Sequence, residues 1–160
     1  MQLEKKVRII FVCEGNVCRS PSAEWIFKKL VKDAGLADCF DITSRGTLNS
    51  TRDEDIYSFS KEVLDEHGIP YERHHAEPIN IQDYRAADYV ICMENYNVIL
   101  VKRLLFTKDY SKLHRLLEYT VRENKDIADP YSTRDFETAY QDIYEGCVGL
   151  LHYFQEKFKA

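Results

Sequence analysis

A cysteine and an arginine stand where a predicted strand turns into a predicted helix. Cys13 follows an apolar run at residues 7–12, and Arg19 comes six positions later, with Gly15 in the turn between them. The first turn of a helix has unpaired N–H groups and partial positive charge, so a tight glycine-containing turn there binds tetrahedral anions. The same field favours a nucleophilic thiolate at Cys13. Arg19 supplies a guanidinium that can hold two phosphate oxygens at once.

Ser20 and Pro21 give the predicted helix a start signal, since serine is a favoured N-cap and proline is favoured at the first helical position. The loop is not a nucleotide-binding Walker loop, because no Gly-Lys-Ser/Thr follows it. Cys13 and Cys18 have loose metal-ligand spacing, but no second Cys/His pair at finger spacing accompanies them, which argues against zinc. For Cys13 alone, a buried apolar role is the competing interpretation.

A carboxyl group on a separate loop could supply the acid that a thiolate reaction at phosphorus needs. Expulsion of the leaving oxygen is easier when an acid protonates it. Asp129 is the best candidate, because Pro130 favours an extended backbone before it and so limits where the carboxyl group points. Tyr131 could form an apolar wall for an aromatic phosphate ester. Alone, this tripeptide also suits a plain turn, and only the Cys13 loop favours the catalytic interpretation.

Alternating strands and helices must position these loops. Apolar residues at helical spacing predict three helices, at residues 23–34, 56–67 and 136–158. Short apolar runs predict four strands, at residues 7–12, 40–44, 89–93 and 113–117. Asn95 is expected to cap a further helix after the third strand. Strands separated by helices imply parallel pairing and right-handed crossovers, hence a three-layer α/β sandwich with its ligand site beyond the carboxyl ends of the strands.

The composition fits one globular domain over residues 1–160, with 44% hydrophobic residues. The formal charge of −5 is spread as mixed signs, which argues against nucleic-acid binding. The N-terminal apolar run of about six residues is too short for a signal peptide or a membrane span. Five irregularly spaced cysteines do not make a disulfide framework. We therefore expect a cytoplasmic protein with no nucleic-acid or membrane partner.

From about Val7 to its end, the chain resembles the low-molecular-weight protein tyrosine phosphatases. The matching motifs are residues 13–21, Ser44-x-Gly46-Thr47, His67-Gly68-Ile69-Pro70, Cys92-Met93, and Asp129-Pro130-Tyr131 followed by Asp135-Phe136-Glu137. The resemblance implies an α/β/α sandwich with a four-stranded parallel sheet. It also implies a two-step protein-tyrosine phosphatase that hydrolyses phosphotyrosine and aryl phosphate monoesters with no metal or other cofactor.

The resemblance further implies the roles of the site residues. Cys13 would form the phosphocysteine intermediate, Arg19 would clamp the phosphate, and Asp129 would act as general acid and then as general base. Ser20 would also assist the thiolate as a leaving group. The phosphate-binding loop would comprise Glu14, Gly15, Asn16, Val17, Cys18 and Ser20. The supporting residues and substrate pocket would comprise Ser44, Leu48, Asn49, Ser50, Pro130 and Tyr131.

The same resemblance implies the partners and a redox response. Phosphotyrosine-containing proteins would be the substrates, and inorganic phosphate would be the product and an inhibitor. The protein is expected to be a monomer or a weak homodimer. Cys18 would form a reversible disulfide with Cys13, which would protect the nucleophile from overoxidation.

The sequence departs from the family pattern at three places. Glu14 stands beside the nucleophile where relatives mostly have an uncharged residue, and its carboxylate is expected to repel acidic substrates. Ser132 replaces the second tyrosine of a pair common in animal members, so phosphorylation there is absent. Residues 48–50 lack the aromatic residue that often forms the opposite wall of the pocket.

Three other functions compete with this interpretation. Thioredoxin-coupled arsenate reductases need two further relay cysteines, and although Cys92 is near one expected position, Ile99 stands at the other. Protein-arginine phosphatases of this fold have a loop threonine where Val17 stands here. A phosphotyrosine-binding module without catalysis would need a defect that the sequence does not show, since every proposed catalytic group is present.

Overall fold

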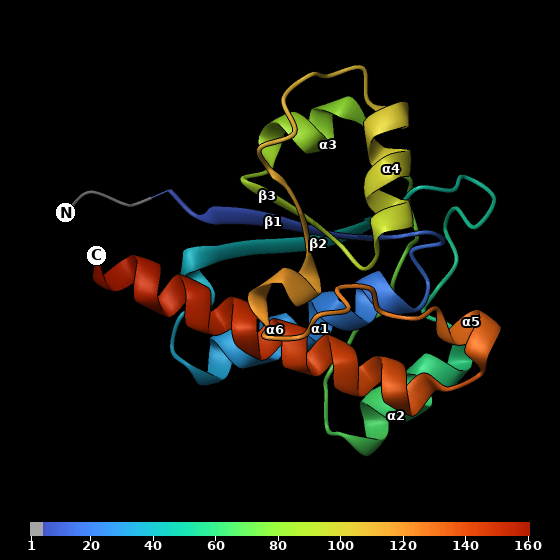
Figure 1. Ribbon diagram of the computed structural model, residues 1–160. Coiled ribbons are helices and arrows are strands. Elements are labelled where there is room, and N and C mark those ends of the chain that lie inside the picture. Colours follow the sequence, from blue (N-terminus) through green and yellow to red (C-terminus); the bar gives the residue numbers. More distant parts are fainter. Residues whose placement is uncertain (1–4) are drawn as a thin grey trace.

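Four parallel strands form one sheet, in the order β2-β1-β3-β4, in the computed structural model, which describes residues 5–160. The strands are β1 (Val7–Cys13), β2 (Phe40–Gly46), β3 (Tyr89–Cys92) and β4 (Leu113–Arg115). Helices α1 (Arg19–Asp33) and α6 (Phe136–Lys159) cover one face of the sheet, and α3 (Ile81–Ala86) and α4 (Asn95–Leu104) cover the other (Figure 1). The expected α/β/α sandwich with a four-stranded parallel sheet is confirmed.

From Ile9 to Cys13 the central strand β1 is buried on both faces, which explains the unbroken apolar run over these residues. Ile9 and Phe11 point into a large core beneath α1 and α6, whereas Ile10 and Val12 point into a smaller core beneath α3 and α4. This alternation follows from the two-residue repeat of a strand. Because β2 and β3 pair with opposite edges of β1, the strand is fixed from both sides.

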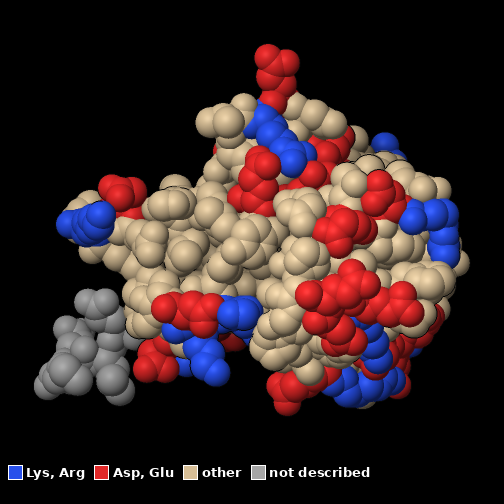
Figure 2. All heavy atoms as spheres, turned by 90° about the horizontal axis from the view of Figure 1, so that it is seen from below, with Lys and Arg blue, Asp and Glu red and all other residues tan. Residues whose placement is uncertain are grey.

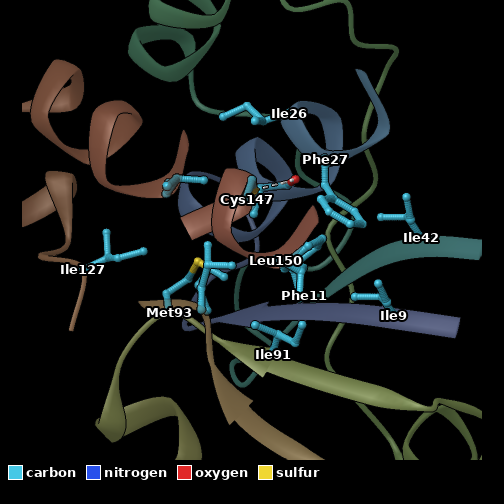
Figure 3. Close-up of a cluster of buried hydrophobic side chains, with 14 of the residues drawn as sticks. Ile9, Phe11, Ile26, Phe27, Ile42, Ile91, Met93, Ile127, Cys147 and Leu150 are labelled. Atoms are coloured by element: carbon cyan, nitrogen blue, oxygen red, sulfur yellow. Dashed lines mark hydrogen bonds between the residues drawn. The ribbon is translucent and has the colours of Figure 1, made fainter. Parts of the chain in front are cut away.

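The large core joins α6 to the sheet, and Figure 3 shows Cys147 and Leu150 of α6 in one cluster with Phe11 of β1 and Phe27 of α1. The ring of Phe27 lies 5.9 Å from that of Phe11 and 5.5 Å from that of Phe40, both edge-to-face. Phe40 in turn contacts Phe154 of α6 at 5.1 Å. Each such side chain contributes about 1.5–3 kcal/mol when fully buried. None of the helices over residues 5–160 is long and apolar enough to cross a membrane.

The start of α1 differs from the sequence prediction. The helix begins at Arg19, and Cys18 occupies the N-cap position without a side-chain cap. Ser20 is therefore not the N-cap, and its hydroxyl lies 3.0 Å from the sulfur of Cys13 instead. The prediction was wrong because it considered only the residue type next to the expected helix, whereas the Ser20 hydroxyl contacts the Cys13 sulfur on the other side of the loop.

Other boundaries also shift. Glu94, and not Asn95, is the N-cap residue of α4. The last strand ends at Arg115, and the rest of the predicted run forms the 3-10 helix η2 (Leu116–Tyr119). Helix α2 (Ser58–Glu66) and the strands β2 and β3 lie within two residues of their expected ends. The short elements η1 (Ala37–Cys39), α3 and α5 (Pro130–Thr133) were not predicted, since a few residues carry little periodicity.

The carboxyl ends of the three longest strands meet at one edge of the sheet. In the register of the sheet, Cys13 is paired with Gly46 and Val12 is paired with Cys92. The strand order reverses at β1, because β2 lies on one side of it and β3 on the other. Such a switch point leaves a crevice between the loops. The loop after β1 therefore lies at the position where this class of sheet binds ligands.

Candidate active site

The loop after β1 turns its carbonyl groups outward. Each carbonyl oxygen of residues 13–17 accepts a hydrogen bond from a donor outside the loop. Cys13 accepts from the N–H of Thr47, Glu14 from the N–H groups of Thr47 and Leu48, and Gly15 from the hydroxyl of Thr51. Asn16 accepts from Nε2 of His74, and Val17 from the N–H of Tyr57. In a trans peptide the next N–H points the opposite way, so these N–H groups face inward. Within residues 5–160, the backbone N–H groups of 14–19 have no acceptor. They form a nest for an anion.

Gly46 lets the end of β2 lie directly against this loop. A Cβ atom at Gly46 would be 2.8 Å from the carbonyl oxygen of Glu14 and 3.0 Å from the Cβ of Asn16. Both neighbours belong to the constrained loop, so neither could move without opening it. Glycine is therefore required by the close approach of two backbones, although its own backbone angles are ordinary.

Asn16 is the buried residue that fixes the shape of the loop. Its backbone is left-handed, with φ of 57°, a conformation that asparagine tolerates better than most residues. The side-chain amide donates to Ser20 Oγ at 2.9 Å and to Ser44 Oγ at 3.0 Å, while its Oδ1 accepts from the N–H of Glu77 at 3.0 Å. Ser44 then donates to the carboxylate of Glu24 at 2.7 Å. All amide groups of Asn16 are thus used to hold the loop.

The Cys13 sulfur lies at the carboxyl end of β1, next to the hydroxyl of Ser20 at 3.0 Å. Because Asn16 already donates to Ser20 Oγ, the serine proton remains free to point at the sulfur or at the carbonyl of Arg45, which is 3.3 Å away. The shorter contact favours the sulfur. A thiolate at Cys13 would therefore accept a hydrogen bond from Ser20.

Arg19 is almost fully buried, with 2% of its surface exposed, and its guanidinium is held from three sides. It donates to the Glu94 carboxylate at 2.5 Å and to the carbonyl of Ile127 at 2.8 Å, and it lies 3.6 Å from Asp129. Burial alone would lower the pKa of Arg19, yet its pKa is raised because Cys13 and two carboxyl groups surround it with negative charge. The guanidinium is therefore a permanent, pre-positioned cation.

Asp129 ends a loop and caps the short helix α5. Its Oδ1 accepts from the N–H of Tyr131 at 3.0 Å, while Oδ2 faces Arg19. Pro130 occupies the first helical position, where its missing N–H costs nothing. The Asp129 carboxyl group is 32% exposed and therefore open to the cavity above the loop.

These groups share one open cavity of about 480 Å³. Its walls include two tyrosines, Tyr57 and Tyr131, whose ring centres are 5.7 Å apart. Tyr131 is 63% exposed, so its ring forms the outer part of the wall. The complete lining is Cys13, Glu14, Gly15, Val17, Cys18, Arg19, Leu48, Thr51, Glu54, Asp55, Tyr57, Asp129 and Tyr131. The space suits a flat ring standing above an anion.

The structure therefore brings most of the predicted site residues together. Asn16, Ser20 and Ser44 lie behind the loop and support it. Three predicted pocket residues do not line the cavity: Asn49 and Ser50 are exposed beside it, and Pro130 is buried in α5. Proximity in sequence to a pocket residue was a poor guide here, because a loop exposes only some of its side chains to the cavity.

Several site residues were missed from the sequence: Glu94 and Tyr57, and also Thr51, Glu54 and Asp55, which line the cavity. Glu94 holds Arg19. The sequence contained a signal for this residue, because Glu94 follows closely after the buried run that forms β3 and therefore lies at the carboxyl edge of the sheet. Tyr57 packs against Tyr131, with 5.7 Å between the ring centres, and so extends the same wall of the cavity. No local pattern marked Tyr57, because it precedes α2 in a stretch without periodicity.

His74 supports the loop from below. Its Nε2 lies 2.7 Å from the carbonyl oxygen of Asn16. Burial lowers the pKa of His74, so the neutral ring with a proton on Nε2 is the form that donates here. Over residues 5–160, no group of three or more His, Cys, Asp or Glu side chains is arranged to hold a metal ion.

The remaining cysteines differ from Cys13 in their surroundings. Burial raises the pKa of Cys18 to about 12, so its thiol is protonated at rest. Cys92 and Cys147 are fully buried, and burial raises the pKa of each. Ile99, at the second relay position of arsenate reductases, is an exposed residue of α4. The disulfide between Cys13 and Cys18 stays a prediction.

Known proteins are similar to this chain in sequence and in fold. The model of the family described as low molecular weight phosphotyrosine protein phosphatase matches residues 8–160. A low molecular weight protein-tyrosine-phosphatase, PtpA of Staphylococcus aureus, is 33% identical over 147 residues, covering 92% of this chain and 93% of PtpA.

Two solved structures extend the comparison. YfkJ from Bacillus subtilis has a TM-score of 0.93 at 32% identity, covering 96% of this chain and 98% of that one. The Drosophila arginine phosphatase DARP has a TM-score of 0.83 at 31% identity, covering 91% and 96%. The chain therefore belongs to the low molecular weight protein-tyrosine-phosphatase family, a family of hydrolases.

Proposed function

We propose that the protein hydrolyses phosphotyrosine and aryl phosphate monoesters through a phosphocysteine intermediate on Cys13, without a metal. One observation carries the proposal: a thiol, a buried guanidinium and a carboxyl group line a single cavity whose floor is a nest of unpaired N–H groups. A phosphate in the nest would have the sulfur of Cys13 at one side and the Asp129 carboxyl group towards the mouth. Arg19 and the N–H groups would carry the charge that develops on the phosphoryl oxygens.

In the first step, the Cys13 thiolate attacks phosphorus and the bond from phosphorus to the phenolic oxygen breaks. Asp129, as a carboxylic acid, transfers its proton to that oxygen, so a neutral phenol leaves and a carboxylate remains. In the second step, this carboxylate takes a proton from water, and the water oxygen attacks the phosphocysteine. The sulfur departs as a thiolate, stabilised by the Ser20 hydroxyl, and inorganic phosphate is released.

Rapid mixing with para-nitrophenyl phosphate tests the two-step mechanism. We expect a burst of nitrophenol, equal to the enzyme concentration, ahead of steady turnover, because the phosphoenzyme is expected to form faster than it is hydrolysed. The burst should persist in a metal chelator. The same enzyme should release phosphate from a phosphotyrosine peptide and leave a matched phosphoarginine peptide intact, because Val17 has no hydroxyl. A preference for the phosphoarginine peptide would favour the arginine phosphatase activity named for DARP over the proposed activity. Loss of all turnover in the chelator would contradict the proposed metal-free mechanism.

Glu94 is proposed as the residue that positions Arg19. Its carboxylate is the shortest contact of the guanidinium, at 2.5 Å. Replacing Glu94 with alanine should lower kcat/KM by about 10- to 100-fold, because a misdirected guanidinium no longer matches the phosphoryl oxygens. The inhibition constant for phosphate should rise in parallel. Glu94→Gln keeps an acceptor for Arg19 and should retain more activity than Glu94→Ala.

Thermal unfolding separates this role from helix capping, since Glu94 is also the N-cap residue of α4. Both Glu94 variants should unfold at similar temperatures while differing in kcat/KM. Full activity of Glu94→Ala would remove Glu94 from the positioning role.

A further inference from the structure

The walls of the cavity carry more negative than positive charge. Arg19 is the one cation among the lining residues, and it lies at the bottom with 2% of its surface exposed. Four carboxylates line the same cavity: Glu14, Glu54, Asp55 and Asp129. A phosphate group descends past these carboxylates to reach the nest. The phosphate of a substrate would therefore meet a positive charge at the bottom of the cavity, whereas the rest of the substrate would meet negative charges on the walls.

Two of the four carboxylates are neutralised within the protein. Asp129 faces Arg19 at 3.6 Å. Asp55 accepts a hydrogen bond from Lys61 at 2.6 Å. Although burial acts to raise its pKa, this bond and those from the N–H groups of His74 and Ile56 hold the pKa well below its usual range.

Glu14 and Glu54 are the two carboxylates left over. Within residues 5–160, neither side chain has a hydrogen bond or an ion pair. They come from different segments, Glu14 from the phosphate-binding loop and Glu54 from the stretch before α2, and both line the cavity. Glu54 is exposed and Glu14 is half-buried, so both charges reach the solvent at the mouth.

With the phosphate in the nest and the phenyl ring in the cavity above it, the residues flanking a phosphotyrosine would lie at this mouth, beside Glu14 and Glu54. Charges within a few ångströms of each other interact more strongly near a protein surface than in bulk water. Two uncompensated carboxylates therefore repel flanking Asp or Glu and attract flanking Lys or Arg. Ordinary salt weakens both effects, since exposed charges are screened beyond about 10 Å at 0.1 M.

We propose that Glu54 and Glu14 are specificity-determining residues that select phosphotyrosine segments flanked by lysine or arginine. This inference rests on the proposed function of the same cavity. It does not require tighter phosphate binding, because the phosphate meets the N–H nest and Arg19, whereas the selection acts on neighbouring residues.

Three matched phosphotyrosine peptides test the inference, with lysine, glutamine or glutamate at the same flanking positions. At low ionic strength, kcat/KM should fall in that order, with the lysine peptide ahead of the glutamate peptide by about tenfold or more, equivalent to about 1.4 kcal/mol. Added salt should bring the ratio towards one. If the three peptides are hydrolysed equally at low salt, the inference is overturned while the proposed function stands. If no phosphotyrosine peptide is hydrolysed, the proposed function itself fails.

Charge variants locate the effect. Glu54→Lys should reduce the lysine-to-glutamate ratio by about fivefold or more, and Glu14→Gln should reduce it by a smaller factor. The matched control is Glu66→Lys, an equal change in charge on exposed Glu66 at the end of α2, outside the cavity lining. Acidic side chains gather towards the α2 and α5 end of the molecule on the face in Figure 2, so this control reports the long-range field. Equal effects of Glu54→Lys and Glu66→Lys would refute a local role for Glu54.

Discussion

Cys13→Ser should abolish turnover while leaving phosphate binding nearly intact. The variant keeps the inward-facing N–H groups and Arg19, which belong to the backbone and to α1 and do not depend on the sulfur. It loses the nucleophile, because a serine hydroxyl in this loop has no base to activate it. Removing a nucleophile typically lowers kcat by about 10⁴-fold or more. Steady-state turnover of para-nitrophenyl phosphate measures the loss, and calorimetric titration with inorganic phosphate measures the retained affinity.

Cys39→Ser is the matched control for this experiment. Cys39 is half-buried in η1, away from the cavity, so its variant should keep turnover within about a factor of two. Near-normal turnover of Cys13→Ser would show that another group attacks phosphorus. Loss of phosphate binding together with turnover would show that the sulfur holds the loop in shape.

Asp129→Asn should reduce turnover by an amount that depends on the leaving group. An amide cannot donate a proton as a carboxylic acid does, so phenol, a poor leaving group, must depart as an unprotonated phenolate. General acid catalysis contributes about 10²- to 10⁴-fold, so the loss with phenyl phosphate should be about a thousandfold. A dinitrophenyl phosphate, whose phenolate is stable without a proton, should lose only about tenfold when its departure limits the rate. Single-turnover release of each phenol is the measurement.

Glu123→Gln serves as the control, because it makes the same carboxyl-to-amide change at an exposed residue outside the cavity. It should leave both substrates unaffected. Equal losses on both esters in Asp129→Asn would assign Asp129 a role in holding Arg19, which it faces at 3.6 Å, and not in proton transfer.

The fold was predictable because its main elements carry local signals. The apolar residues of β1 indicated a strand buried on both faces, and the structure places Ile10 and Phe11 in two different cores. The long apolar stripe of α6 gave its position to within one residue at either end. Short elements such as α5 were missed, since four residues complete barely one helical turn.

The details of the site were less predictable. Ser20 was expected to cap α1, but it contacts the Cys13 sulfur. Glu94 is 75 positions from the arginine that it holds, and no pairing rule in a single sequence connects them. Tyr57 packs beside Tyr131 on the wall of the cavity, although the two residues are far apart in the sequence. The contacts of Glu94 and Tyr57 join segments distant in sequence, and such contacts depend on how the strands are ordered in the sheet.

The sequence by itself determined the reactive loop, because a thiol, a glycine and an arginine between a strand and a helix interact over one short segment. It also determined the family and the layered fold. Only the tertiary structure decided what surrounds that loop: the outward carbonyls with their donors, the carboxylate of Glu94 on Arg19, and the two unpaired carboxylates at the mouth. Local chemistry follows from neighbours along the chain, whereas electrostatic environment follows from neighbours in space, which parallel crossovers bring from distant parts of the sequence.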